Sequence, residues 1–214
     1  MRVGIAGYGV VGKTRHRSIE SNTSYKVTAI SESNQEARQS IAPGLEVYND
    51  YQSLIANAEI DVIFISLPNQ FAAEATCLSL QKGLHVFCEK PPARTHAELL
   101  EVEKKSLQFP ALKLMYGFNH RFHLSVEKAK ALIKSDSLGR IINMKGVYGK
   151  SQMINFNQTD WRTNREASGG GILLDQGIHM LDLMRYLSEE DFTQVFSFID
   201  NAFWNFDVED NAYV

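Results

Sequence analysis

A glycine-rich turn near the N-terminus constrains the fold more than any other feature. Residues 7–12 read Gly-Tyr-Gly-Val-Val-Gly, the spacing G-x-G-x-x-G, between an apolar segment at 2–6 and a helix-like segment at 11–21. In such a turn the first glycine allows a tight bend, the second lets the backbone approach a pyrophosphate, and the third lets helix and strand pack closely. The helix N-terminus then directs its unpaired N–H groups at the phosphates. The expected cofactor contacts are Gly7, Gly9, Val10, Val11 and Gly12.

An acidic residue supports this interpretation. Glu32 follows Gly12 by 20 residues, at the end of a β-branched segment at 26–31 that we predict as the second strand. An acid at this place accepts hydrogen bonds from the adenine-side ribose. It would repel a 2′-phosphate, and the next residues, Ser-Asn-Gln at 33–35, carry no cation. The pattern therefore predicts NAD as the preferred cofactor, with NADP possible.

The same turn also fits the phosphate loop G-x-x-x-x-G-K-[ST], in which Lys13 would reach the outer phosphates and Thr14 would bind magnesium. Such an enzyme also needs an apolar strand that ends in a magnesium-binding acid. The most apolar strand, at 60–67, has its acid at the start, as Asp61. We therefore favour the dinucleotide site, and otherwise expect Lys13 and Thr14 on the helix surface.

Strand-like and helix-like segments alternate through the first half, which is typical of an open parallel α/β sheet. Thr95, followed by Glu98, is a capping box that starts a helix. We predict strands at 2–6, 26–31, 60–67, 84–88 and 113–118, and helices at 11–21, 71–81 and 95–107.

The pattern changes after residue 118. We expect a Rossmann domain over 1–119 and, over 120–214, an α+β domain with an open antiparallel sheet for substrate binding and dimerisation, incomplete at its C-terminal end. We predict helices at 124–135 and from Gly171 to Leu187, a strand at 141–148, a polar loop at 153–165, and antiparallel strands at 194–199 and 201–207.

Two groups of residues could carry chemistry. Lys90 follows the predicted strand 84–88, and the carboxyl ends of parallel strands line the ligand crevice. Asp175, His179 and Asp182 have the spacing i, i+4, i+7, which places them on one helix face. A histidine held between carboxylates is suited to take a proton from an alcohol. The alternatives are an exposed turn lysine and a structural polar cluster. A metal site is disfavoured because no third ligand is evident.

Composition narrows the partners. The net charge of −3 gives no indication of a nucleic-acid or membrane-surface partner, and two cysteines make no disulfide framework. No segment is long enough to span a bilayer, so we expect a cytoplasmic protein. An aromatic face and planar donors suit a sugar-like ring, so we expect Arg121, Trp161 and Arg162 to bind substrate. A core tryptophan and surface salt bridges are the ordinary alternative.

Five motifs in this order resemble the Gfo/Idh/MocA oxidoreductases, the family of glucose–fructose oxidoreductase and inositol dehydrogenase. The motifs are GYGVVG, SLPNQF, KGLHVFCEKPPA, GFNHRFH and GGGILLDQGIHMLDL. The resemblance implies an NAD(P)-dependent dehydrogenase that acts on a CH–OH group of a sugar, polyol or nucleotide sugar. It implies Lys90, Asp175 and His179 as the catalytic set, which also binds substrate. It further implies cofactor contacts from Pro68, Asn69, Glu89 and Lys90.

The sequence departs from the family pattern in two ways. Ala72 stands where members often carry a histidine. Members are also longer, so we expect further sheet strands in a full-length, homo-oligomeric parent. Some relatives hydrolyse glycosides through transient oxidation, which leaves an NAD-dependent glycoside hydrolase as an alternative. A dinucleotide-binding protein without catalysis is another.

Overall fold

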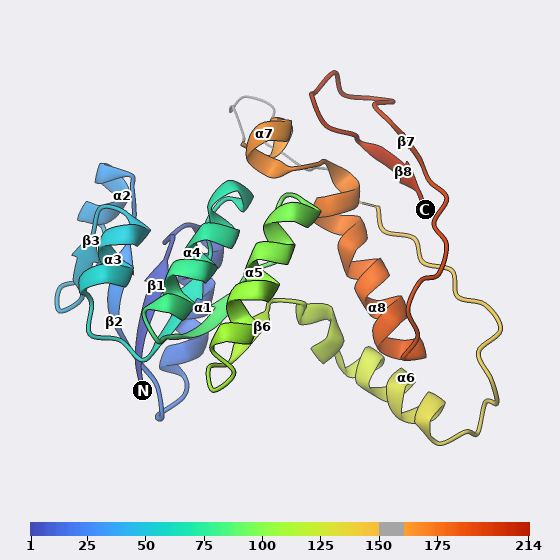
Figure 1. The fold of residues 1–214 in the computed structure, drawn as a ribbon, viewed down its shortest axis with the longest axis horizontal. Coiled ribbons are helices and arrows are strands. Elements are labelled where there is room, and N and C mark those ends of the chain that lie inside the picture. The colour runs from blue at the N-terminus through green and yellow to red at the C-terminus, as the bar shows by residue number, and fades with distance from the viewer. Residues whose placement is uncertain (150–160) are drawn as a thin grey trace. The chain divides into compact units, whose positions relative to one another are not determined.

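The chain divides into two compact units, Met1–Gly117 and Phe118–Val214. The computed structural model describes residues 1–149 and 161–214 (Figure 1). No helix in these two ranges is long and apolar enough to cross a membrane.

The first unit is built on one parallel sheet of six strands in the order β3-β2-β1-β4-β5-β6. The chain passes from β1 to β2 and β3 on one side of β1, and then crosses back to β4, β5 and β6 on the other side, so the strand order reverses between β1 and β4. In sheets of this order, ligands bind at the carboxyl ends of the strands where the order reverses. The fold predicted from the sequence is thus confirmed. The strands are β1 (Arg2–Ala6), β2 (Lys26–Ser31), β3 (Glu46–Tyr48), β4 (Val62–Ile65), β5 (His85–Cys88) and β6 (Leu114–Tyr116).

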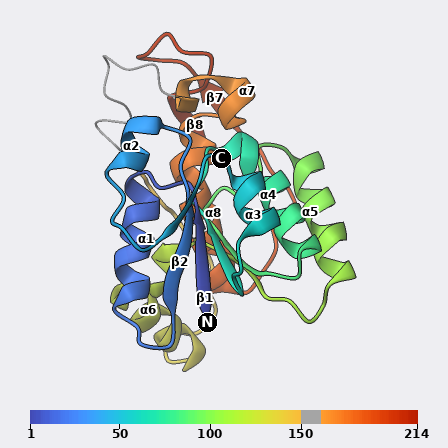
Figure 2. The ribbon, with the colours of Figure 1, turned by 90° about the vertical axis from the view of Figure 1, so that its left-hand side faces the viewer.

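Helices cover both faces of this sheet. Figure 2 shows α1 on one face and α3, α4 and α5 on the other. Ile5 and Ile30 pack with Ile19 of α1, whereas Ile63 and Ile65 belong to the core beneath α3 and α4. Burial on both sides explains why the central strands are continuously apolar. The helices are α1 (Val10–Glu20), α2 (Gln35–Gln39), α3 (Tyr51–Asn57), α4 (Asn69–Gln81) and α5 (His96–Gln108).

Three short elements of this unit escaped the sequence analysis: α2, β3 and α3. The five residues of α2 bury nothing, and β3 is a three-residue edge strand. Asp50 is the N-cap of α3, and its carboxylate accepts from the Ser53 amide at 2.6 Å. The predicted cap of α5 is confirmed, because the Glu98 amide donates to the Thr95 hydroxyl at 3.2 Å.

The second unit consists mainly of helices with one small hairpin. The predicted helix at 124–135 is confirmed as α6. The elements of the second unit are a 3-10 turn (Asn119–Phe122), α6 (Leu124–Lys134), a 3-10 turn (Trp161–Thr163), α7 (Arg165–Ser168), a π-helical turn (Leu173–Gly177), α8 (Ile178–Ser188), β7 (Phe198–Asp200) and β8 (Asn211–Tyr213).

Two predicted strands in this unit are wrong. Segment 141–148 is neither helix nor strand, and Ile142 is 93% exposed and Val147 83% exposed. Its alternating pattern needs a neighbouring strand to form a ladder, and none of the described residues supplies one.

The predicted strand at 201–207 is a loop instead. Its backbone amides at 202, 203 and 204 donate to the Asp210 carboxylate at 2.7–2.8 Å, so they do not enter a ladder. The antiparallel pair joins β7, at the end of predicted segment 194–199, to β8. Of the predicted loop 153–165, residues up to 160 lie outside the described part, and the remainder contains the two short helical turns at 161–163 and 165–168.

Candidate active site

The glycine turn is held tightly at its two ends. Gly7 has φ +86°, and a Cβ there would lie 2.5 Å from the Ser66 carbonyl oxygen. A Cβ on Gly12 would lie 2.1 Å from the carbonyl oxygen of Gly7. These neighbours are backbone atoms of β1's turn and of the segment after β4, so no side chain can move aside. The first and third glycines are therefore required by the fold itself.

Gly9 differs, because no packing contact among residues 1–149 and 161–214 requires a glycine there. A Cβ at Gly9 would meet no atom of these residues within 4 Å. The residue is the N-cap of α1, with no side-chain cap and no acid in the first turn. Adjacent Val10 is 84% exposed. An open approach to uncapped helix N–H groups fits a bound pyrophosphate.

Glu32 is fixed beside this turn. Its two carboxylate oxygens accept from the Tyr8 amide at 3.2 Å and the Asn34 amide at 2.9 Å. Arg38 of α2 donates to the carbonyl oxygens of Glu32 at 2.7 Å and Ser33 at 2.8 Å. No cation follows β2 directly in the sequence, but Arg38 reaches this place from α2, an element that the sequence pattern did not predict.

The residues of the alternative phosphate loop take ordinary surface positions. The Thr14 hydroxyl donates to the Val10 carbonyl at 2.9 Å, within its own helix. The Lys13 ammonium lies 5.8 Å from the centre of the Tyr8 ring. These contacts match the helix-surface alternative stated for both side chains.

The segments after β4 and β5 reach the same sheet edge as the glycine turn, because these strands are parallel to β1. Pro68 is the N-cap of α4, and Asn69 is its buried first residue. The Glu89 amide donates to the Ile65 carbonyl at 2.9 Å, which fixes the start of the segment that carries Lys90. Both Glu89 and Lys90 are half-buried.

In the second unit, the glycine run at 169–171 anchors the helix that carries the predicted catalytic residues. Gly169 ends α7 with φ +84°. A Cβ on Gly171 would lie 1.9 Å from the Glu209 carbonyl oxygen. The Gly171 amide donates to the buried Glu209 carboxylate, and the Ile172 amide to the Glu209 carbonyl, both at 2.9 Å. The glycine run is therefore needed for a close backbone contact with Glu209, and not simply for a flexible loop.

The helix after this run is not the single α-helix that we predicted. Asp175 lies in the π-helical turn Leu173–Gly177, and His179 lies in the first turn of α8. A π turn shifts the register, so i, i+4 spacing does not by itself place Asp175 and His179 on one face. Such turns are frequent at functional sites. The Asp175 carboxylate accepts from the Gln176 side-chain amide at 2.6 Å.

His179 is 5% exposed and lies among aromatic rings. The imidazole of His120 stacks on it at 4.0 Å between ring centres and 15° between planes. Tyr148 lies roughly parallel at 6.2 Å, and Phe118 meets it edge-on at 6.4 Å. His120 and Tyr148 were not predicted as site residues, although His120 stands in the GFNHRFH motif.

Asp182, which we expected on one helix face with His179, is paired with Arg121. Both of its oxygens accept from Arg121, one from Nε at 2.8 Å. The guanidinium also lies over the rings of Phe118, at 5.6 Å, and Tyr186, at 5.2 Å. Arg121, which we expected to bind substrate, is thus occupied within the protein.

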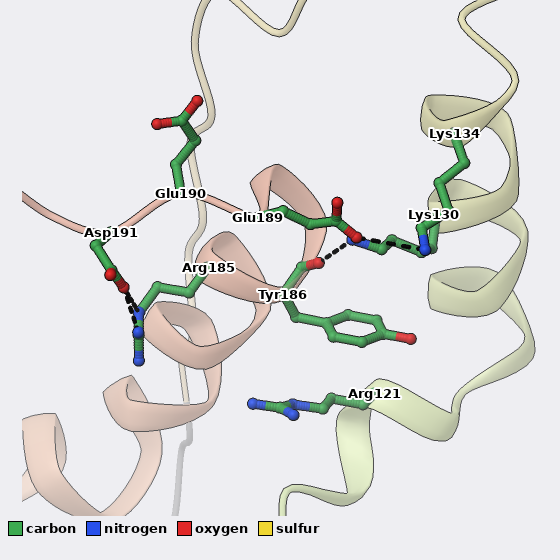
Figure 3. A pocket seen from close by; sticks show the side chains of 8 residues that line it. All are labelled: Arg121, Lys130, Lys134, Arg185, Tyr186, Glu189, Glu190 and Asp191. Atoms are coloured by element: carbon green, nitrogen blue, oxygen red, sulfur yellow. Dashed lines mark hydrogen bonds and ion pairs between the residues drawn. The ribbon is translucent and has the colours of Figure 1, made fainter.

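Arg121 also borders a pocket of about 390 Å³ between α6 and α8, shown in Figure 3. Lys130 and Lys134 of α6 pair with Glu189 at 2.6 and 3.4 Å, and Arg185 pairs with Asp191. Four cations and three carboxylates line the pocket, and Arg121 is paired with Asp182 outside the lining, so most of the charges are already engaged in ion pairs. The pocket is best understood as the polar contact that joins the two helices.

The remaining predicted substrate residues, Trp161 and Arg162, are half-buried neighbours. The Arg162 guanidinium lies 4.4 Å from the centre of the Trp161 ring. The two side chains therefore present one combined aromatic and cationic surface.

Family models match both parts of this sequence. Residues 1–107 match the oxidoreductase family with an NAD-binding Rossmann fold, and residues 126–214 match the GFO/IDH/MocA C-terminal domain. The chain belongs to the Gfo/Idh/MocA oxidoreductase family. The resemblance inferred from the five motifs is confirmed.

Individual members of the Gfo/Idh/MocA family agree with this. D-glucoside 3-dehydrogenase of Escherichia coli K12 is 32% identical over 193 residues, which covers 87% of this chain and 54% of the relative. Levoglucosan dehydrogenase of Pseudarthrobacter phenanthrenivorans is 30% identical over 207 residues, and the alignment covers 89% of this chain and 52% of the relative. A solved levoglucosan dehydrogenase with NADH and levoglucosan superposes with TM-score 0.90 at 27% identity, covering 99% of this chain and 62% of that one. The chain spans about half the length of these curated relatives.

Proposed function

We propose that the chain binds NAD and belongs to a dehydrogenase that oxidises a carbinol of a sugar, polyol or nucleotide sugar. The observation that carries the proposal is Gly9: its Cβ position faces open space at an uncapped helix N-terminus, beside the fixed Glu32 carboxylate. The named activities of the family members support the substrate class.

NAD, when bound, supplies the hydride acceptor, and the protein supplies placement and proton transfer. We assign His179 as the base that takes the hydroxyl proton. Its burial among rings fixes the imidazole and limits access of water to it. Asp175, in the π turn, supports the orientation of the base, and Lys90 stabilises the alkoxide. A positioned acid–base group of this kind contributes roughly 10²–10⁴-fold in rate.

Trp161 and Arg162 are proposed as substrate contacts, because their joint surface suits a polyhydroxylated ring. Arg121 contributes indirectly by holding Asp182. Pro68 and Asn69 are proposed to contact the cofactor from the start of α4. We further propose a cytoplasmic, homo-oligomeric protein without a nucleic-acid partner, given its net charge of −3.

The test mixes the protein with NAD and a panel of sugars, inositols and nucleotide sugars, and follows the absorbance of reduced nicotinamide. Lys90→Ala and His179→Ala should each abolish most turnover, whereas His96→Ala, at the start of α5, should not. Full activity in both catalytic variants would overturn the assignment. Release of sugar without net NADH would instead favour a glycoside hydrolase.

A further inference from the structure

An ion pair joins the glycine-turn helix to the segment that carries Lys90. Arg15 of α1 donates from Nε to a Glu89 carboxylate oxygen at 2.6 Å, and its terminal nitrogen lies 2.5 Å from the same oxygen. The two side chains are only 25% and 17% exposed. Arg15 stands three residues after Gly12, and Glu89 directly precedes Lys90.

The guanidinium rests on an aromatic floor. Arg15 lies 5.1 Å from the centre of the Phe87 ring, and Phe87 stacks on Phe64 at 4.9 Å. These rings belong to paired residues of β4 and β5. A cation over an aromatic face is favoured, and a planar guanidinium loses less freedom than an ammonium would. The floor therefore fixes where the pair lies on the sheet.

The carboxylate is enclosed from the other side by Gly117. A Cβ on Gly117 would lie 2.7 Å from a Glu89 carboxylate oxygen. The Gly117 amide donates to the Cys88 carbonyl at 2.8 Å, so its backbone cannot retreat without losing that bond. Glu89 is thus held by its backbone through Ile65 and by its side chain through Arg15.

We propose that Arg15 and Glu89 are positioning residues, which set Lys90 at a fixed place relative to the N-terminus of α1. Glu89 then acts through Arg15, and not as the direct cofactor ligand that the family resemblance implies. The pair also neutralises a carboxylate near the place where a pyrophosphate would bind. This inference rests on the proposed function, since Lys90 matters through its action on the substrate.

The test compares Arg15→Met, Glu89→Gln and the double variant with Arg17→Met, a control on the exposed side of the same helix. Four quantities are measured: kcat, the Kd for NADH from its fluorescence, the melting temperature, and the acetylation rate of Lys90 relative to other lysines. Because a misplacement of about 1 Å can cost on the order of 10²-fold, each single variant should lower kcat by about 10- to 100-fold. The Kd of Glu89→Gln for NADH should differ from that of the wild type by less than about threefold.

Coupling within the pair gives the second criterion. The double variant should be no worse than the single variants, because the two residues act as one unit. The Lys90 acetylation rate should change in the same variants and stay constant in Arg17→Met. If Arg15→Met does not fold, Glu89→Gln and the double variant decide the question, since neither leaves a buried carboxylate unpaired.

Other outcomes would overturn the inference. A loss of NADH affinity in Glu89→Gln alone, with Arg15→Met unchanged, would make Glu89 a direct ligand. Folded variants with normal kcat and normal Lys90 acetylation would make the pair purely structural. If the wild-type protein turned over no substrate, the proposed function would fail, while the acetylation rates would still decide whether the pair positions Lys90.

Discussion

Two alanine substitutions in the glycine turn should separate folding from binding, because Gly12→Ala should lower stability and Gly9→Ala should lower NADH affinity. Gly12→Ala places a Cβ 2.1 Å from the Gly7 carbonyl oxygen, so backbone must shift. Overpacking of this kind costs about 1–3 kcal/mol, and alanine's helix advantage over glycine returns roughly 0.5–1 kcal/mol. Because the contact is to backbone, we expect an overpacking cost of about 3 kcal/mol. After the helix gain is subtracted, the free energy of unfolding should fall by about 2 kcal/mol.

Gly9→Ala should leave the free energy of unfolding within about 0.5 kcal/mol of the wild type, because its Cβ meets no atom of the described part of the chain within 4 Å and its φ of −70° suits alanine. The same Cβ would occupy the approach to the helix N-terminus. NADH affinity should therefore fall at least about tenfold, which is about 1.4 kcal/mol.

Urea denaturation and NADH fluorescence titration on both variants measure the two effects separately. Wild-type NADH affinity in Gly9→Ala would refute the argument that this turn approaches a pyrophosphate. Wild-type stability in Gly12→Ala would refute the packing argument.

Three further predictions concern single side chains. Glu32→Ala should weaken NAD binding and improve NADP binding in paired titrations, since it removes the charge that opposes a 2′-phosphate; tighter NADP binding by the unmodified protein would contradict this. Burial raises the pKa of the Cys88 thiol to about 12, so a thiol reagent at pH 8 should label it only after unfolding, as measured by mass spectrometry in Cys77→Ser. Burial alone would raise the pKa of Glu98, but hydrogen bonds from Arg94 hold it below its usual value. A lowered folded-state pKa stabilises the protein at neutral pH, and this contribution is lost as pH falls through it. Glu98→Gln should therefore reduce stability at pH 7 and show a smaller further loss in acid, whereas an unchanged acid limb in urea denaturation would argue against the pair.

The first unit could be predicted well because its signals are local. Continuous apolar strands and capped helices follow from short stretches of sequence, as with segment 60–67 and the Thr95 cap. Elements without a buried face gave no such signal, as in α2. Segment 141–148 failed for the opposite reason: its alternation is a local signal, but a strand exists only with a partner.

Residues of the candidate site could be proposed from the sequence where topology determines their place, but not where residues distant in the sequence meet. Parallel strands deliver Glu32 and Lys90 to one edge of the sheet, so strand order predicted their place. The spacing of Lys90 by itself favoured an exposed turn lysine, and only the family resemblance implied a catalytic role. The stacking of His120 on His179 joins residues 59 positions apart, and the Arg15 pair joins residues 74 apart. No periodicity reports such contacts. The π turn was missed because a helix-forming sequence does not reveal an extra residue in its ladder.

The contact between Gly171 and Glu209 affects the order in which the protein can mature during synthesis. The amide at 171 finds its carboxylate 38 residues later. A ribosome adds roughly 5–20 residues per second, so the start of the π-helical turn remains unanchored for seconds after it is made. The sheet of the first unit uses only residues up to 117 and faces no such delay. The nascent chain should thus be able to capture dinucleotide before the region around His179 is in place, and ribosome-bound chains stalled at different lengths would reveal that sequence of events.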